Sequence, residues 1–192
     1  MSLKRAGLFL GSSSIIILAF FAYMGAFNSS NLTKKEVGPF HLVYVEYVGS
    51  YKDFTTVIKS VQNTMNDNAI QNYNAFGMFF DDPRFVADAN LRSYIGVIVT
   101  EADLEKVNLL VEKGEIAYKK LEKSVYVSAS FPYRNFISIF LGILKIYPAL
   151  DEYGVANNFP TYVNKKIGYE NDFIMEIYKP DAIYYYMTLP GN

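Results

Sequence analysis

An uncharged stretch near the N-terminus constrains this chain most, and it runs from Ala6 to Phe27 as AGLFLGSSSIIILAFFAYMGAF. A helix rises about 1.5 Å per residue, so this stretch would span about 33 Å, enough to cross the hydrocarbon core of a bilayer. Serine hydroxyls in such a helix can bond to its own backbone, and Tyr23 lies where aromatic rings favour the membrane interface. The stretch predicts a transmembrane helix over residues 6–27 that anchors the chain in a lipid bilayer.

A cleaved signal peptide is the alternative interpretation of this stretch. The apolar region of a signal peptide is usually about 7–15 residues long and ends at a small-x-small site. The best such site here, Met24-Gly25-Ala26, fits that form poorly. The anchor is therefore favoured, but its orientation stays open, because two basic residues at 4–5 balance two more at 34–35.

The segments around the predicted anchor suit an organelle membrane. No acidic residue precedes Glu36, which is typical of a mitochondrial inner-membrane protein with an uncleaved signal-anchor. Formal glycosylation sequons begin at Asn28 and Asn31, and the endoplasmic reticulum stays open as the other location. The predicted organisation is a flank over residues 1–5, the transmembrane helix over 6–27, a tether over 28–38 and one domain over 39–192.

Charge and composition exclude several classes of function. The formal net charge is -1, so the chain has no general attraction to nucleic acid. It contains no cysteine, which excludes disulfides, thiolate metal sites, iron–sulfur clusters and a cysteine nucleophile. A metal site built on histidine or a Ser-His-Asp triad would have to use His41, the only histidine. We therefore expect no metal, no cofactor and no catalytic residue.

The remaining sequence predicts an α+β domain. Apolar stripes with helical spacing predict a helix from about residue 54 to 65, a second one from about 100 to 113 before Gly114, and a long one over 135–153. Within the long helix, residues 136–144 are uncharged but too few to span a bilayer, so we expect this helix to be buried with Phe140 in the core. Runs of β-branched and aromatic residues predict strands over residues 40–48, 75–80, 91–99, 115–121, 124–131, 162–168, 172–178 and 182–187.

The order of these elements indicates an internal duplication. A strand leads through Val48-Gly49-Ser50-Tyr51 into a helix, and a later strand leads through Ser130-Phe131-Pro132-Tyr133 into another. Further strands follow each helix. We expect two strand–helix–strand–strand units in one antiparallel sheet, with both long helices on one face and a ligand-binding concavity on the other.

Short motifs in a fixed order carry a resemblance to a known family. They are Gly49-Ser50-Tyr51, Phe79-Phe80-Asp81-Asp82-Pro83, Leu91-Arg92 before Gly96-Val97, and Glu176-Ile177-Tyr178. This pattern resembles the gyrase-inhibitor-like (GyrI-like) domain, which is also the effector-binding domain of some bacterial multidrug transcription regulators. The resemblance implies a duplicated, helix-covered sheet and a ligand pocket.

Two further motifs, Ala129-Ser130-Phe131-Pro132-Tyr133 and Tyr147-Pro148-Ala149-Leu150-Asp151, make the chain more specifically similar to one group. That group is the testis-expressed ER-phagy receptor family of animals, in which one N-terminal membrane helix precedes this domain. Those receptors continue into a long acidic tail that binds an autophagy modifier, whereas this chain ends at Asn192. The resemblance therefore implies the domain without the working part of the autophagy role.

The resemblance also implies a candidate ligand site centred on Glu176, since the bacterial regulators bind cationic drugs with a carboxylate among aromatic rings. Such a site suits an amphipathic cation on physical grounds. Alternatively, tyrosine hydroxyls or Arg92 satisfy Glu176 within the protein, which we expect because bulky rings fill space. The adjacent pair Asp81 and Asp82 precedes Pro83 and favours a turn over a metal site. The candidate ligand-binding residues are Glu176, Tyr178, Tyr51, Tyr133, Tyr184 and Tyr186.

Three functions follow from this sequence as hypotheses. The first is a non-catalytic accessory subunit or adaptor that docks on other membrane proteins of an organelle complex, for example a mitochondrial respiratory assembly. The second is an ER-phagy receptor-like membrane adaptor. The third is a small-molecule binder for cationic amphipaths or a GyrI-like hydrolase, although no nucleophile with a base is evident.

Overall fold

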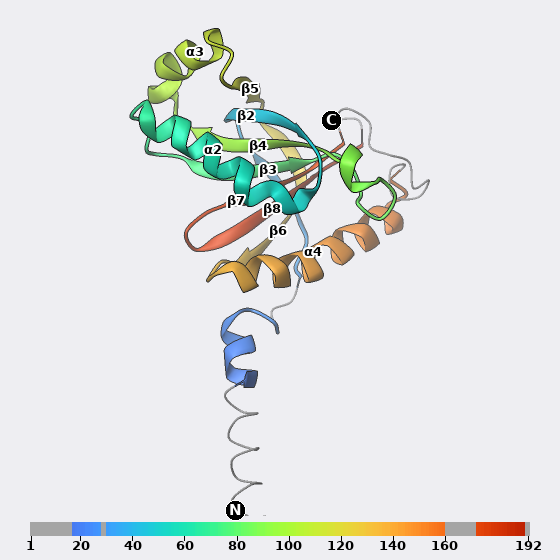
Figure 1. Cartoon of the computed structure of the whole chain (residues 1–192). Coiled ribbons are helices and arrows are strands. Elements are labelled where there is room, and N and C mark those ends of the chain that lie inside the picture. Colours follow the sequence, from blue (N-terminus) through green and yellow to red (C-terminus); the bar gives the residue numbers. More distant parts are fainter. Residues whose placement is uncertain (1–16, 28–29, 160–171, 191–192) are drawn as a thin grey trace, which may run out of the picture.

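The protein is built on a single eight-stranded sheet with helices, as shown by a computed structural model that describes residues 17–27, 30–159 and 172–190 (Figure 1). The sheet order is β1-β6-β8-β7-β3-β4-β2-β5, and every pairing is antiparallel. The expected α+β class with an antiparallel sheet is therefore confirmed. The strands are β1 (Thr33–Val37), β2 (Phe40–Val48), β3 (Asn74–Phe79), β4 (Arg92–Val99), β5 (Ala117–Leu121), β6 (Ser124–Pro132), β7 (Ile174–Tyr178) and β8 (Ala182–Thr188).

The main helices are α2 (Phe54–Asp67), α3 (Leu104–Glu112) and α4 (Phe136–Ala156), and 3-10 turns lie at Tyr51–Asp53, Asp88–Asn90 and Glu101–Asp103. The units β2–α2–β3–β4 and β6–α4–β7–β8 have the same order of elements. From the seam between β3 and β7, the sheet reads β3-β4-β2 in one direction and β7-β8-β6 in the other. The predicted duplication is thus present, with β5 and β1 added at the two ends.

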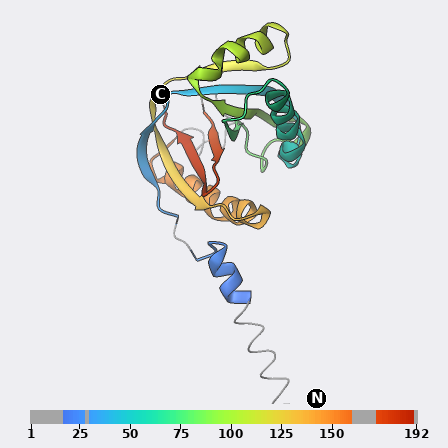
Figure 2. The same cartoon turned by 90° about the vertical axis from the view of Figure 1, so that its left-hand side faces the viewer.

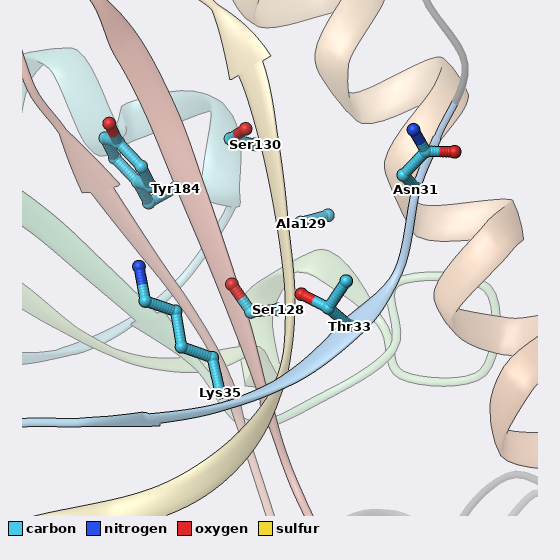
Figure 3. Close-up of a pocket in the computed structure, with 7 residues that line it drawn as sticks. All are labelled: Asn31, Thr33, Lys35, Ser128, Ala129, Ser130 and Tyr184. Atoms are coloured by element: carbon cyan, nitrogen blue, oxygen red, sulfur yellow. The ribbon is translucent and has the colours of Figure 1, made fainter.

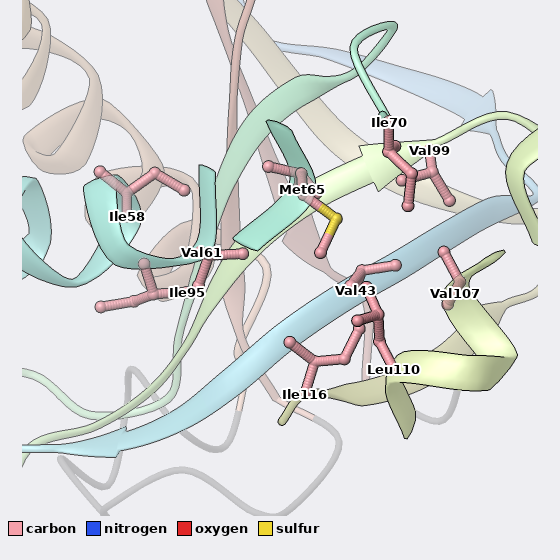
Figure 4. Close-up of a cluster of buried hydrophobic side chains, with 11 residues drawn as sticks. Val43, Ile58, Val61, Met65, Ile70, Ile95, Val99, Val107, Leu110 and Ile116 are labelled. Atoms are coloured by element: carbon pink, nitrogen blue, oxygen red, sulfur yellow. The ribbon is translucent and has the colours of Figure 1, made fainter. Parts of the chain in front are cut away.

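All three helices cover the same face of the sheet. Register places one row of cross-strand partners on that face: Val43, Val97, Ala75, Tyr178, Ile183 and Phe131. Ile58 of α2 and Leu110 of α3 pack in the cluster that contains Val43 and Val97 (Figure 4), while Ile146 of α4 packs in the cluster of Phe131 and Ile183. The expectation of both long helices on one face is confirmed.

The sheet is curved (Figure 2). Its opposite face buries a cluster of its own that is rich in aromatic residues. Alternate residues of each strand point to this side, because side chains alternate across a strand. Its buried members are Leu42, Tyr44, Phe76, Met78, Tyr126, Met175, Ile177 and Tyr186. This face is therefore a second core rather than an open ligand concavity.

The structure corrects the predicted transmembrane helix over residues 6–27. Among the residues that the structure describes, no helix is long and apolar enough to cross a membrane; residues 6–16 lie outside that part. The helical segment 17–23 ends in a turn at Gly25, which has a φ of 86°. Beside it, the side chain of Met24 is fully buried. A left-handed glycine terminates a helix, and here it turns the chain onto Phe131 of the domain.

Three further predictions concern the tether, Phe140 and the strand over residues 162–168. Within the predicted tether, residues 33–37 form strand β1, which pairs with β6. Phe140 is not in the core, because its side chain is 57% exposed while Gly142 and Ile146 on the other side of α4 are buried. The strand predicted over residues 162–168 lies outside the described residues.

Candidate functional site

Glu176 is buried and hydrogen-bonded to two tyrosines. Glu176 lies on the helix-covered face of β7, and only 2% of its surface is exposed. The Tyr147 hydroxyl of α4 donates to Glu176 Oε1 at 2.7 Å, and the Tyr178 hydroxyl donates to Oε2. Burial raises the pKa of Glu176, and the two hydroxyl bonds offset only part of that rise. The expectation that tyrosine hydroxyls bond this carboxylate within the protein is confirmed.

Aromatic rings from three elements occupy the region between α2 and α4 beside this carboxylate. Register sets Gly77 of β3 directly opposite Glu176, where a Cβ would lie 2.6 Å from the Phe79 ring and 3.0 Å from the Phe54 ring. The Phe54 ring centroid lies 5.2 Å from that of Tyr178 and 6.2 Å from that of Phe79. Glycine at 77 thus makes room for rings rather than for a ligand.

Tyr51, another candidate, anchors the loop before β4. Its hydroxyl lies 2.9 Å from the Arg92 carbonyl oxygen and accepts the Asp81 N–H at 3.1 Å. Burial raises the pKa of the Tyr51 hydroxyl. Arg92 binds both carboxylate oxygens of buried Asp81, at 2.7 and 2.9 Å, so the guanidinium pairs with Asp81 rather than with Glu176.

The two adjacent aspartates take separate ion pairs. Asp82 binds Arg84, which also reaches Asp151 of α4 at 2.6 Å.

The histidine lies apart from these aspartates: His41 forms a hydrogen bond with the Tyr118 hydroxyl at 2.8 Å. Within the described ranges, no group of three or more metal-ligating residues is placed to hold an ion.

The six candidate residues do not converge on one site. Glu176 and Tyr178 lie on the helix-covered face, and Tyr133 packs at the margin of the cluster of Phe131, Ile183 and Ile146, called the α4 cluster below. Tyr184 and Tyr186 belong to the cluster on the opposite face. The carboxylate therefore points between the helices, and the site expected on the opposite side of the sheet is corrected.

Tyr184 instead lines a shallow depression of about 160 Å³ on the face away from the helices (Figure 3). The other lining residues are mostly polar and come from β1, β6 and the chain before β1. Ligand pockets usually enclose about 300 Å³ or more, so this depression is small for an amphipathic ligand.

Two residues of the Glu176 environment were not predicted as site residues. Tyr147 lies 29 positions from its partner, and only its place in a family-like motif distinguished it. Tyr185 lies opposite Glu176 on β8, fully buried, and its hydroxyl has no hydrogen-bond partner among the described residues. No spacing rule in the sequence indicates either contact.

Comparisons with known proteins give the fold and one distant relative. No model of a known protein family matches the chain. Human Testis-expressed protein 264 is 26% identical over 119 residues, which make up 60% of this chain and 35% of the human protein. The matched region thus spans about a third of the length of that relative.

Among solved structures, the EcmrR C-terminal domain is similar to this chain with a TM-score of 0.52 at 12% identity, over 82% of this chain and 96% of that domain. A hydrolase from Listeria innocua matches at 12% identity with a TM-score of 0.44, over 83% of this chain and 91% of that one. Likeness as distant as the second says nothing about activity here. The chain therefore shares its fold with the EcmrR C-terminal domain, which is the coarse part of the expected resemblance; no family model confirms the GyrI-like family itself.

Proposed function

We propose that this chain is a non-catalytic accessory or adaptor protein of an organelle membrane complex, with a GyrI-like domain whose ligand site is closed. A mitochondrial respiratory assembly is one such complex. The observation that carries the proposal is the Glu176 carboxylate, both oxygens of which accept bonds from tyrosine hydroxyls of the same chain.

A site for cationic ligands needs a carboxylate that lacks a partner, so that the ligand offsets the desolvation of its charge. Glu176 is already bonded and 2% exposed. A ligand would have to displace Tyr147 from α4 and the Phe54 ring from α2. The same closure opposes hydrolysis, because a substrate could not reach the carboxylate.

Binding of a fluorescent cationic amphipathic dye tests this proposal. We expect no micromolar binding to the wild-type chain and no difference in Glu176→Gln. Glu46→Gln is the matched control, since Glu46 is an exposed carboxylate on the opposite face of the sheet. Micromolar binding that Glu176→Gln abolishes and Glu46→Gln preserves would overturn the proposal in favour of a ligand-binding protein.

Partner association is the positive half of the test. Extraction of the native protein in mild detergent should yield a complex much larger than the 21.8 kDa chain. Glu176→Gln should co-migrate with the same complex as the wild type. A protein that migrates as a free monomer from its native membrane would contradict an accessory role.

A membrane adaptor of the ER-phagy receptor kind is the second candidate, and the 26% identity to human Testis-expressed protein 264 favours it. Binding of an autophagy modifier to the chain in a pull-down would support this candidate. Co-migration with a respiratory assembly instead would support the first.

A further inference from the structure

The outer side of α4 carries an apolar stripe that the domain leaves uncovered. We define the α4 stripe as Phe136, Ile137, Phe140, Ile143 and Leu144, whose exposed fractions are 76%, 38%, 57%, 41% and 55%. Their spacing puts them along one side of the helix. The other side, which includes Gly142 and Ile146, packs on the sheet. The first half of α4 is therefore apolar on both sides, although only one side faces the core.

A second element extends this surface. The segment 17–27 lies against the start of α4: Asn135 Nδ2 is 3.8 Å from Met24 Sδ, and the Arg134 guanidinium lies 5.5 Å from the Tyr23 ring centroid. Figures 1 and 2 both place this segment at the same end of the molecule as α4. It also exposes large apolar side chains, at Ile17, Leu18, Phe20, Phe21, Tyr23 and Phe27.

Basic residues flank the α4 stripe on both sides. The sequence from 135 to 144 is uncharged, and the basic residues Arg134 and Lys145 bracket it. Helix α3 lies at the opposite end of the molecule (Figure 1). There, residues 101–115 contain five acidic side chains and two basic ones. An anionic surface would therefore attract the basic residues that flank the α4 stripe more than the mainly acidic segment 101–115.

From these observations we infer that the α4 stripe and the segment 17–27 form a docking face for the interfacial layer of a phospholipid membrane. Stripe side chains offer no hydrogen-bonding groups, and the flanking Tyr23, Arg134 and Lys145 are of the types that favour the headgroup region. This association lies on the membrane surface and needs no spanning helix. It does not depend on the state of Glu176.

Tryptophan fluorescence in the full chain tests the docking face, because the natural sequence contains no tryptophan. Phe140→Trp places a single reporter in the α4 stripe. Leu109→Trp is the matched control, since Leu109 is 56% exposed on α3 at the far end. With vesicles of mixed zwitterionic and anionic phospholipid, we expect a blue shift for Phe140→Trp and at least twofold quenching by brominated acyl chains. Leu109→Trp should show neither effect.

Two outcomes would overturn the inference. In one, the chain floats with the vesicles but brominated lipid does not quench Phe140→Trp, so the stripe does not touch lipid. In the other, Phe140→Trp is shielded without vesicles because a second copy or another protein covers the stripe. Far-ultraviolet circular dichroism confirms that each variant is folded, and the dye assay at Glu176 reports separately on the proposed function.

Discussion

Glu176 makes the stability of this protein depend on pH in a defined direction. Burial raises its folded-state pKa above the unfolded value of about 4.3. The folded state therefore binds this proton more tightly. The resulting stabilisation is fully present below the unfolded pKa and is lost as pH rises through the raised folded pKa.

Glu176→Gln should remove that dependence, because the amide is neutral at every pH. We expect the free energy of unfolding of the wild type, minus that of Glu176→Gln, to fall by about 1.4 kcal/mol per pH unit between the two pKa values. Urea unfolding at a series of acidic pH values measures it. A difference that stays constant across this range would show that the carboxylate is not desolvated as the structure has it.

Replacement of Phe140 and of Phe131 by alanine should differ widely in cost, although both are phenylalanines of the second unit. Phe140→Ala should change the free energy of unfolding by less than about 0.5 kcal/mol, because the ring is 57% exposed. Phe131→Ala should cost about 3–5 kcal/mol, because that ring is 2% exposed in the α4 cluster. Thermal unfolding of the two variants, measured side by side, tests this difference. A large loss of stability in Phe140→Ala would show that the ring is packed in a core.

Helix α4 begins where its sequence provides a cap. The Asn135 side-chain oxygen accepts the Ile137 N–H at 2.8 Å, which satisfies one of the free donors of the first turn. Asn135→Ala should therefore lower the free energy of unfolding by about 1 kcal/mol. Asn63→Ala, on the exposed side of α2, serves as the control and should cost nothing. Equal losses in the two variants would argue against the cap.

The close approach of α4 to the sheet is a property of the whole molecule. Two elements that are remote in the sequence meet where a Cβ at Gly142 would lie 2.4 Å from the Tyr185 hydroxyl oxygen. Gly142→Ala should cost about 1–3 kcal/mol through overpacking. Tyr185→Phe alone should raise the free energy of unfolding by roughly 1 kcal/mol, since it removes a buried hydroxyl that lacks a partner among the described residues.

The double variant Gly142→Ala/Tyr185→Phe completes a cycle that measures this contact. The clash involves the hydroxyl itself, so its removal should recover most of the loss caused by Gly142→Ala. Chemical unfolding of the four proteins gives the coupling energy. Additive effects would mean that α4 docks on the sheet at another depth.

Most elements and their repetition could be predicted from the sequence, because both follow from local patterns; strand β1, predicted as part of the tether, is an exception. Runs of aromatic and β-branched residues predicted β2 and β4, and Gly114 marked the end of α3, where its φ is 72°. Two similar strand–helix–strand–strand orders were enough to predict the duplication. The class of the fold and the common face of the helices followed from them.

The contacts between elements, and which side of each element faces outward, depend on how the chain folds in three dimensions. Helix α4 is apolar on both sides in its first half, so periodicity could not tell that small residues such as Gly142 face the sheet while Phe140 faces outward. The uncharged N-terminal run gave no sign that Met24 packs on the domain. Tyr147 reaches Glu176 across 29 positions only because α4 folds back over the β7 strand. Each of these outcomes depends on which elements meet in space, and the spacing of residues along the chain does not contain that information.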